Sequence, residues 1–212
     1  MIYKNEIKFT EGVITLTGFL GSKEVFQFAK CLFVLISKKG YKDIELNFTH
    51  AYPVRESFMV PALAIIRDAR LHGVQFELVH PANASAKSIF HNANWEYLID
   101  DTKYMPSTYV GEGHLPASVY KNADEQTQAV DKIMSMILKS VQLNRKQLVA
   151  LEWSINEITD NVLNHAQSEL GGIVQASSVV VSGKQFVEFV VADAGMGIPR
   201  SLSEANGVRA LE

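Results

Sequence analysis

The chain has 212 residues, of which 47% are hydrophobic and 20% charged, and its formal net charge is −3. This slight acidity disfavours electrostatic attraction to nucleic acid or to an anionic membrane surface. The longest apolar runs are interrupted by charges before the roughly 20 residues that a membrane-spanning helix needs. Cys31 is the only cysteine, so neither an internal disulfide nor a cysteine metal cluster can form. We therefore expect a cytoplasmic globular protein of one or two domains.

The first hundred residues alternate between strand-like and helix-like patterns. Residues 7–9 and 13–17 are rich in β-formers and flank Glu11 and Gly12, which predicts a hairpin. Apolar side chains at helical spacing predict helices over residues 22–39, 55–72 and 85–98, and strands are expected over residues 43–48 and 74–79. This ββαβαβα order predicts a small open sheet with helices packed on it, in an α/β domain over residues 1–100.

A break follows the first domain. Residues 101–121 gather turn-forming side chains without a sustained period, so we expect a linker there. A second domain is expected over residues 122–212. Asn122 and Glu125 have the spacing of a capping box at the start of one helix, and a longer helix is expected from about residue 144 to residue 168. A hairpin over residues 173–181 and 186–191 completes the pattern.

The long second helix has one apolar face. Its apolar residues recur every three or four positions and predict a single stripe that faces the core. The members of this predicted stripe are Leu148, Leu151, Ile155, Ile158 and Val162. Trp95 and Trp153 also lie in helical patterns and are expected in the core.

The same helix carries a polar stripe formed by Glu157, Asn161, Asn164 and His165, with Asp160 at its border. A solvated helix face is the ordinary explanation. Asparagine, however, is a mediocre helix former that competes for backbone hydrogen bonds, so its repeated use favours a functional role. An amide oxygen one turn after a carboxylate also suits hydrated Mg²⁺, and the carboxylate can accept a proton from an attacking water or hydroxyl.

The second candidate feature follows the last predicted strand. Residues 186–192 form an almost continuous apolar run, typical of a buried strand, that leads directly into Asp193. A buried aspartate needs a partner, such as an amino group of a ligand, and Gly195 and Gly197 would let a flat ring approach the main chain. A tight turn in which Asp193 accepts a local hydrogen bond is the alternative.

Together, and in this order, the two features resemble the N box and the G1 box of the GHKL ATPases, the superfamily of gyrase, heat-shock chaperone, histidine kinase and MutL. The resemblance spans residues 122–212 and implies a truncated Bergerat-type α/β sandwich that binds ATP and Mg²⁺. It implies that Glu157 is the general base, that Asn161 binds Mg²⁺, and that Asp193 accepts the adenine amino group. Gly195 and Gly197 would shape the adenine pocket.

Two further cofactor-binding positions, Asp160 and His165, are expected on the same face of the N-box helix. The spacing of Glu157, Asn161 and His165 is most similar to that of the anti-sigma-factor serine kinases. Family members continue into an ATP lid and a second glycine box, which this sequence lacks. We therefore expect a fragment of a longer protein with weak affinity for ATP.

The N-terminal domain resembles a STAS domain, the fold of anti-sigma-factor antagonists, in its element order and in the strands over residues 43–48 and 73–79. The resemblance implies a protein partner for this domain. Ser57 falls where such domains carry a phosphorylated serine, and a helix cap is the alternative role for it.

The sequence thus predicts a Mg-ATP-binding signalling or regulatory protein that acts as a protein serine kinase or an ATPase switch. The alternative is a non-catalytic interaction module with a degenerate or incomplete nucleotide pocket. The phosphoryl acceptor and the formation of a homodimer stay open.

Overall fold

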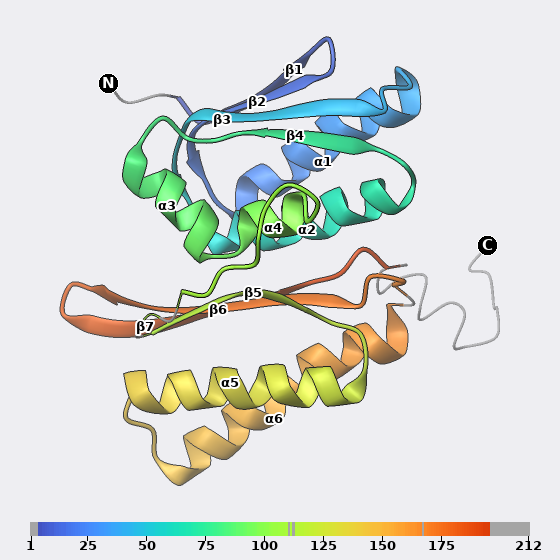
Figure 1. Cartoon of the computed structure of the whole chain (residues 1–212). Coiled ribbons are helices and arrows are strands. Elements are labelled where there is room, and N and C mark those ends of the chain that lie inside the picture. The colour runs from blue at the N-terminus through green and yellow to red at the C-terminus, as the bar shows by residue number, and fades with distance from the viewer. Residues whose placement is uncertain (1–3, 110, 112, 167, 196–212) are drawn as a thin grey trace, which may run out of the picture. The chain divides into compact units, whose positions relative to one another are not determined.

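The computed structural model describes residues 4–109, 111, 113–166 and 168–195. The chain divides into two compact units, Met1–Gly111 and Glu112–Glu212. Each unit combines a sheet with helices (Figure 1), so the chain is an α+β protein, as its sequence predicts. Among the described residues, no helix is both long and apolar enough to cross a membrane.

Unit 1 contains a four-stranded sheet in the order β1-β2-β3-β4. Its strands are β1 (Glu6–Thr10), β2 (Val13–Leu20), β3 (Asp43–Val54) and β4 (Gln75–Val79). The first two strands form the expected antiparallel hairpin, and the other pairs are parallel. Glu11 and Gly12 make the hairpin turn with φ values of 47° and 84°. Two successive positive φ angles suit the right-handed twist of the flanking strands.

The helices of unit 1 follow the predicted positions. They are the 3-10 turn η1 (Ser22–Glu24), α1 (Val25–Phe33), the π-helical η2 (Val34–Lys38), α2 (Glu56–Leu71), α3 (Ala84–Asn92) and α4 (Trp95–Ile99). The single helix predicted over residues 85–98 is in fact two, because Asn94 adopts a left-handed conformation with φ 66°. Trp95 is buried, as expected. Ser57 does not cap α2, whose N-cap residue is Arg55.

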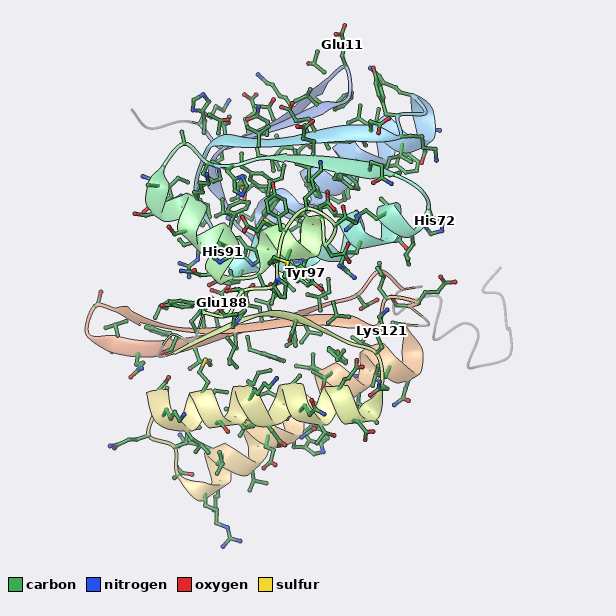
Figure 2. All side chains as sticks on the ribbon, in the orientation of Figure 1. Glu11, His72, His91, Tyr97, Lys121 and Glu188 are labelled. Carbon is green, nitrogen blue, oxygen red and sulfur yellow. The ribbon has the colours of Figure 1, made fainter. Side chains whose placement is uncertain are left out.

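One carboxylate joins the two short helices of unit 1 to the end of β4. Glu96 lies at the start of α4, and its Oε2 is 2.8 Å from Nε2 of His80, which directly follows β4. Its Oε1 is 2.7 Å from Nδ1 of His91 on α3, which is labelled in Figure 2. Glu96 is nearly buried, so both of its oxygens are satisfied by protein rather than by bulk water.

Unit 2 contains β5 (His114–Tyr120), α5 (Ala123–Ser140), α6 (Arg145–His165), β6 (Gly172–Val181) and β7 (Lys184–Ala192). The strand β5 lies inside the segment expected to be a linker, so that expectation was wrong for residues 114–120. Pro116 and a register irregularity between Leu115 and Ser118 obscure its strand pattern. Such interruptions are tolerated because β5 is an edge strand.

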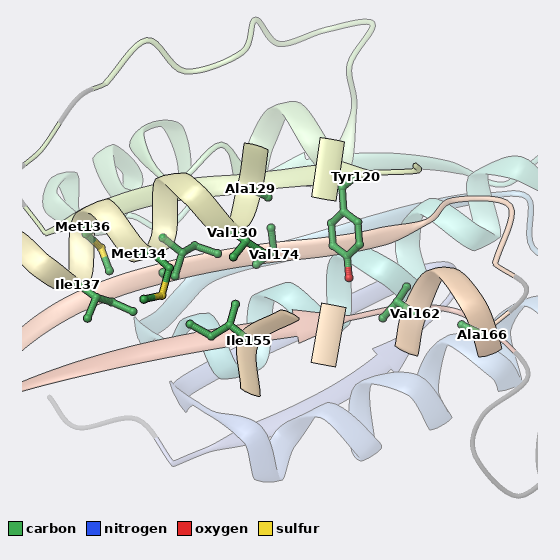
Figure 3. Packing of buried hydrophobic residues seen from close by; sticks show 12 residues of the cluster. Tyr120, Ala129, Val130, Met134, Met136, Ile137, Ile155, Val162, Ala166 and Val174 are labelled. Atoms are coloured by element: carbon green, nitrogen blue, oxygen red, sulfur yellow. The ribbon is translucent and has the colours of Figure 1, made fainter. Parts of the chain in front are cut away.

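The three strands of unit 2 form an antiparallel sheet in the order β5-β6-β7. Figure 1 shows α5 and α6 side by side on one face of this sheet. The core between sheet and helices includes Tyr120, Val130, Ile133, Ile155 and Val174, some of which are labelled in Figure 3. This packing fixes how the long helix α6 presents its polar side.

Candidate functional site

The helix α6 begins where the sequence predicts. Asn144 is its N-cap, and its side chain accepts a hydrogen bond from the Gln147 N–H at 3.0 Å. The Gln147 side chain in turn accepts one from the Asn144 N–H at 3.0 Å. This reciprocal capping box satisfies two backbone donors that the first helical turn otherwise leaves unpaired.

The core-facing side of α6 differs in part from the predicted stripe. Ile155 and Val162 are buried as expected, but Ile158 is 48% exposed and Trp153 is 66% exposed. Thr159, which is fully buried, occupies the position between Ile155 and Val162 instead. The prediction followed the spacing of apolar residues along the helix, whereas burial depends on which side of the helix meets the sheet.

The predicted polar stripe is exposed. Glu157, Asp160 and Asn161 all lie on the solvent side of α6. The amide nitrogen of Asn164 donates a hydrogen bond of 2.7 Å to Oδ2 of Asp160. Within the described parts of the chain, the side chains of Glu157 and Asn161 have no hydrogen-bond or ion-pair partner. His165 is the last residue of α6, and its side chain lies outside what the structure describes.

The strand β7 is less buried than the sequence predicts, and Asp193 lies in the turn that follows it. Phe186 is 51% exposed, Lys184 and Gln185 are also exposed, and residues 187–192 are only half-buried. Among the described strands, β7 pairs on one side alone, with β6. Asp193 is exposed, and its Oδ1 accepts a hydrogen bond of 2.7 Å from the Gly195 N–H. This local bond is the turn geometry named above as the alternative to ligand binding. Gly197 lies outside the described residues.

Gly195 packs directly against the end of α6. A Cβ atom added at this glycine would lie 2.6 Å from both the carbonyl carbon and the Cβ of Ala166, and it would also collide with the Ala166 carbonyl oxygen. The need for glycine therefore comes from the protein's own helix. This contact brings the Asp193 turn to the same end of α6 as the polar stripe.

A buried tyrosine lies beneath both features. Tyr120 ends β5, is fully buried, and donates a hydrogen bond of 3.1 Å from its hydroxyl to the carbonyl oxygen of Thr159. Figure 3 shows its ring within the core and its hydroxyl directed toward α6. Gly172 pairs with Tyr120 across the sheet, and a Cβ there would collide with the Tyr120 ring. A glycine at this position makes room for the ring.

Two acidic residues affect the ionisation of Tyr120. Burial raises its pKa above the ordinary value for tyrosine, and the nearby negative charges of Asp193 and Asp160 raise that pKa further. Among the described residues, neither aspartate forms an ion pair with a lysine, arginine or histidine. The region is therefore acidic and open to a cation or to a hydrogen-bond donor.

A second polar contact supports the same helix from α5. The amide nitrogen of Gln126 donates a hydrogen bond of 2.9 Å to Oγ1 of Thr159, and that hydroxyl donates one of 2.9 Å to the Ile155 carbonyl. Sequence reasoning did not identify Tyr120, Gln126 or Thr159. The sequence did contain a signal for Thr159, because this residue falls at the helical spacing of the core residues. A hydroxyl buried at such a position needs hydrogen-bond partners.

The fold and the site together define an α+β protein in which a polar helix face and an acidic turn meet at one end of an antiparallel sheet. Comparisons with protein-family models, with curated proteins and with solved structures find no match. Any chemical role of this site is therefore inferred from its own residues.

Proposed function

We propose that unit 2 binds Mg-ATP in the manner of the GHKL ATPases, within a cytoplasmic signalling or regulatory protein whose unit 1 binds a protein partner. The observation that carries this proposal is the packing of Gly195 against Ala166, which brings the turn after β7 to the end of α6. The negative charges of Asp160 and Asp193 both raise the pKa of Tyr120. These aspartates come from α6 and from the turn after β7, the two segments that resemble the N box and the G1 box. Two motifs that are separate in the sequence thus share one location.

The residues present fit the adenine part of the ligand. Asp193 uses Oδ1 for the turn hydrogen bond, which leaves Oδ2 to accept a hydrogen bond from the adenine amino group. A carboxylate acceptor gives a stronger hydrogen bond than a neutral one. The hydrogen bond from Gly195 also fixes the orientation of the carboxylate before a ligand binds, which reduces the entropic cost of binding.

The polar stripe fits the phosphates and their cation. Asn161 would hold Mg²⁺ through its amide oxygen, and the ion, when bound, would neutralise phosphate charge. Among the described residues no group of three or more His, Cys, Asp or Glu side chains could hold a metal ion. Mg²⁺ bound mainly by phosphate oxygens and water does not need such a group. Glu157, one turn before Asn161, would accept the proton of the attacking hydroxyl or water.

One observation favours the alternative of a non-catalytic interaction module. The exposed Asp193 already takes part in a complete local turn, so its carboxylate has a structural role without any ligand. The two functions differ in what they require of Glu157, because a module that only binds needs no proton acceptor beside the phosphates. Measuring binding and turnover separately distinguishes them.

The test is calorimetric titration of the chain with ATP in the presence of Mg²⁺, at protein concentrations that suit weak binding. We expect Asp193→Asn to weaken ATP binding by roughly tenfold or more, because a charged acceptor is replaced by an amide. Asp131→Asn, at an exposed position of α5, is the matched control and should bind as the wild type does. Equal affinities of the wild type and Asp193→Asn would refute the assignment.

Turnover is tested with Glu157→Gln. This variant should bind ATP as the wild type does and should lose ATP hydrolysis or transfer of the γ-phosphoryl group. Binding without turnover in the wild type would instead favour the interaction module.

A further inference from the structure

An unusual surface lies on α1 of unit 1, outside the segments that carry the predicted motifs. Phe26 is 79% exposed and Phe33 is 55% exposed. These residues are seven positions apart, so they lie on the same side of the helix, separated by about 10.5 Å along its axis. The opposite side of α1 buries Phe28, Cys31 and Leu32 in the core. Two aromatic rings therefore occupy the solvent side, where charged residues are usual.

Lysines alternate with these rings. Lys23, Phe26, Lys30 and Phe33 follow each other at intervals of three, four and three residues, and all four are exposed. This is the spacing of the contact line of a helix that packs along a second helix. We call these four residues the Lys–Phe line. A solvated helix face does not require aromatic residues at this spacing.

The π-helical segment η2 adds a third lysine. In a π-helix each N–H donates to the carbonyl five residues earlier, as the Lys39 N–H does to the Val34 carbonyl. Lys38 stands five residues after Phe33, and its Nζ lies 5.7 Å from the centre of the Phe33 ring. The ring is thus part of a cationic surface.

The charge of this segment is opposite to that of the whole chain. Residues 22–39 contain four lysines and one glutamate, which leaves a net charge of +3 in a chain of net charge −3. The one acid, Glu24, accepts a hydrogen bond of 2.9 Å from the Gly21 N–H and so acts locally at the start of the helix.

We propose that the Lys–Phe line binds an acidic amphipathic helix of a protein partner, with apolar side chains against Phe26 and Phe33 and carboxylates against Lys23 and Lys30. This specifies the partner in the proposed function, but it rests on unit 1 alone and does not depend on ATP binding. A second copy of the chain is a poorer occupant, because two segments of charge +3 repel. A bilayer is also a poorer occupant, because α1 commits its continuous apolar side to the core.

The proposal is tested with two synthetic helical peptides that differ only in charge. In both peptides, leucine and a charged residue alternate at intervals of three and four positions. The charged residue is glutamate in one peptide and lysine in the other. Fluorescence anisotropy of the labelled peptides should show that the wild-type chain prefers the glutamate peptide by roughly tenfold or more. The double variant Lys23→Glu/Lys30→Glu should reverse this preference.

The controls separate charge, contact and folding. Lys42→Glu/Lys87→Glu changes two exposed lysines of unit 1 outside the line and should leave the preference unchanged. Phe26→Ser/Phe33→Ser should weaken binding of the glutamate peptide by roughly tenfold, with an unchanged circular dichroism spectrum because both rings are exposed. Asp193→Asn should bind the glutamate peptide as the wild type does, even if the proposed ATP site fails its own test.

Three results would overturn the proposal. The first is equal affinity, or no affinity, of the wild type for the two peptides. The second is binding to phosphatidylcholine vesicles with about a quarter phosphatidylserine that Phe26→Ser/Phe33→Ser abolishes, without binding to the glutamate peptide. The third is a dimer of the wild type in sedimentation that Phe26→Ser/Phe33→Ser converts to a monomer, because the Lys–Phe line would then be a self-association surface.

Discussion

Replacing Gly195 with alanine tests whether the Asp193 turn is held against α6. The added Cβ would lie 2.6 Å from the carbonyl carbon and the Cβ of Ala166, whereas non-bonded carbon atoms normally approach to about 3.5–4.0 Å. The atoms in its way include helix backbone, which cannot rotate aside as the tip of a flexible side chain can. The turn must therefore move by roughly 1 Å.

The expected effect on stability is smaller than the effect on binding. Inserting a methyl group into a packed contact costs about 1–3 kcal/mol, and we expect the lower end of that range because Asp193 is exposed. A displacement of 1 Å, however, removes Asp193 from hydrogen-bond geometry. ATP affinity should therefore fall by roughly tenfold or more, as in Asp193→Asn.

The assay compares Gly195→Ala with Gly183→Ala. Gly183 has φ +74° in the turn between β6 and β7, and a Cβ there would have no neighbour within 4 Å. Alanine at this position costs about 1 kcal/mol of backbone strain without displacing any packed group. Urea unfolding should show a similar loss of stability in both variants, and calorimetry should show a loss of ATP binding in Gly195→Ala alone.

One result would refute the reasoning. If Gly195→Ala unfolds at the same urea concentration as the wild type and binds ATP equally well, then the turn does not pack against Ala166 and Asp193 is not held beside the polar stripe.

Two further predictions concern polar groups buried in the cores. Tyr120→Phe should cost about 0.5–1.5 kcal/mol of unfolding free energy. Because folding raises the pKa of Tyr120, the wild type should also lose stability as the pH rises above about 10, where the unfolded tyrosine ionises. Urea titrations across that pH range should show that Tyr120→Phe lacks this part of the loss. Glu96→Ala should lower the free energy of unfolding by about 1–3 kcal/mol, because it removes the carboxylate that His80 and His91 share. Its control is Glu77→Ala, at an exposed position of β4, which should leave the melting temperature in calorimetry nearly unchanged.

The parts of the fold with local signals could be predicted from the sequence. The start of α5 followed from the spacing of Asn122 and Glu125, since Asn122 is the N-cap and its side chain accepts a hydrogen bond of 2.9 Å from the Glu125 N–H. The hairpin of unit 1 followed from Glu11 and Gly12, which adopt positive φ as the turn requires. Both signals involve residues within three positions of each other, so no knowledge of the tertiary structure was needed.

Features that depend on distant contacts could not be predicted. The strand β5 contains Pro116 and small residues, and its pairing with β6 joins segments more than fifty residues apart along the printed sequence. Trp153 was expected in the core because it lies in a helical pattern, yet it lies on the solvent side of α6. Which side of a helix is buried depends on the sheet beneath it, and hydrophobic spacing alone determines this only approximately.

The buried residue Thr159 shows why the candidate site could be predicted only in part. Glu157, Asn161 and Asp193 stand out in the sequence because together they match two motifs in the expected order. Their placement, however, depends on Thr159, whose carbonyl accepts a hydrogen bond from Tyr120 of β5 and whose hydroxyl accepts one from Gln126 of α5. These bonds tie α6 to the first strand and to the first helix of unit 2. A sequence motif identifies the groups that act on a ligand, whereas the groups that orient them are buried and come from segments that the motif does not include.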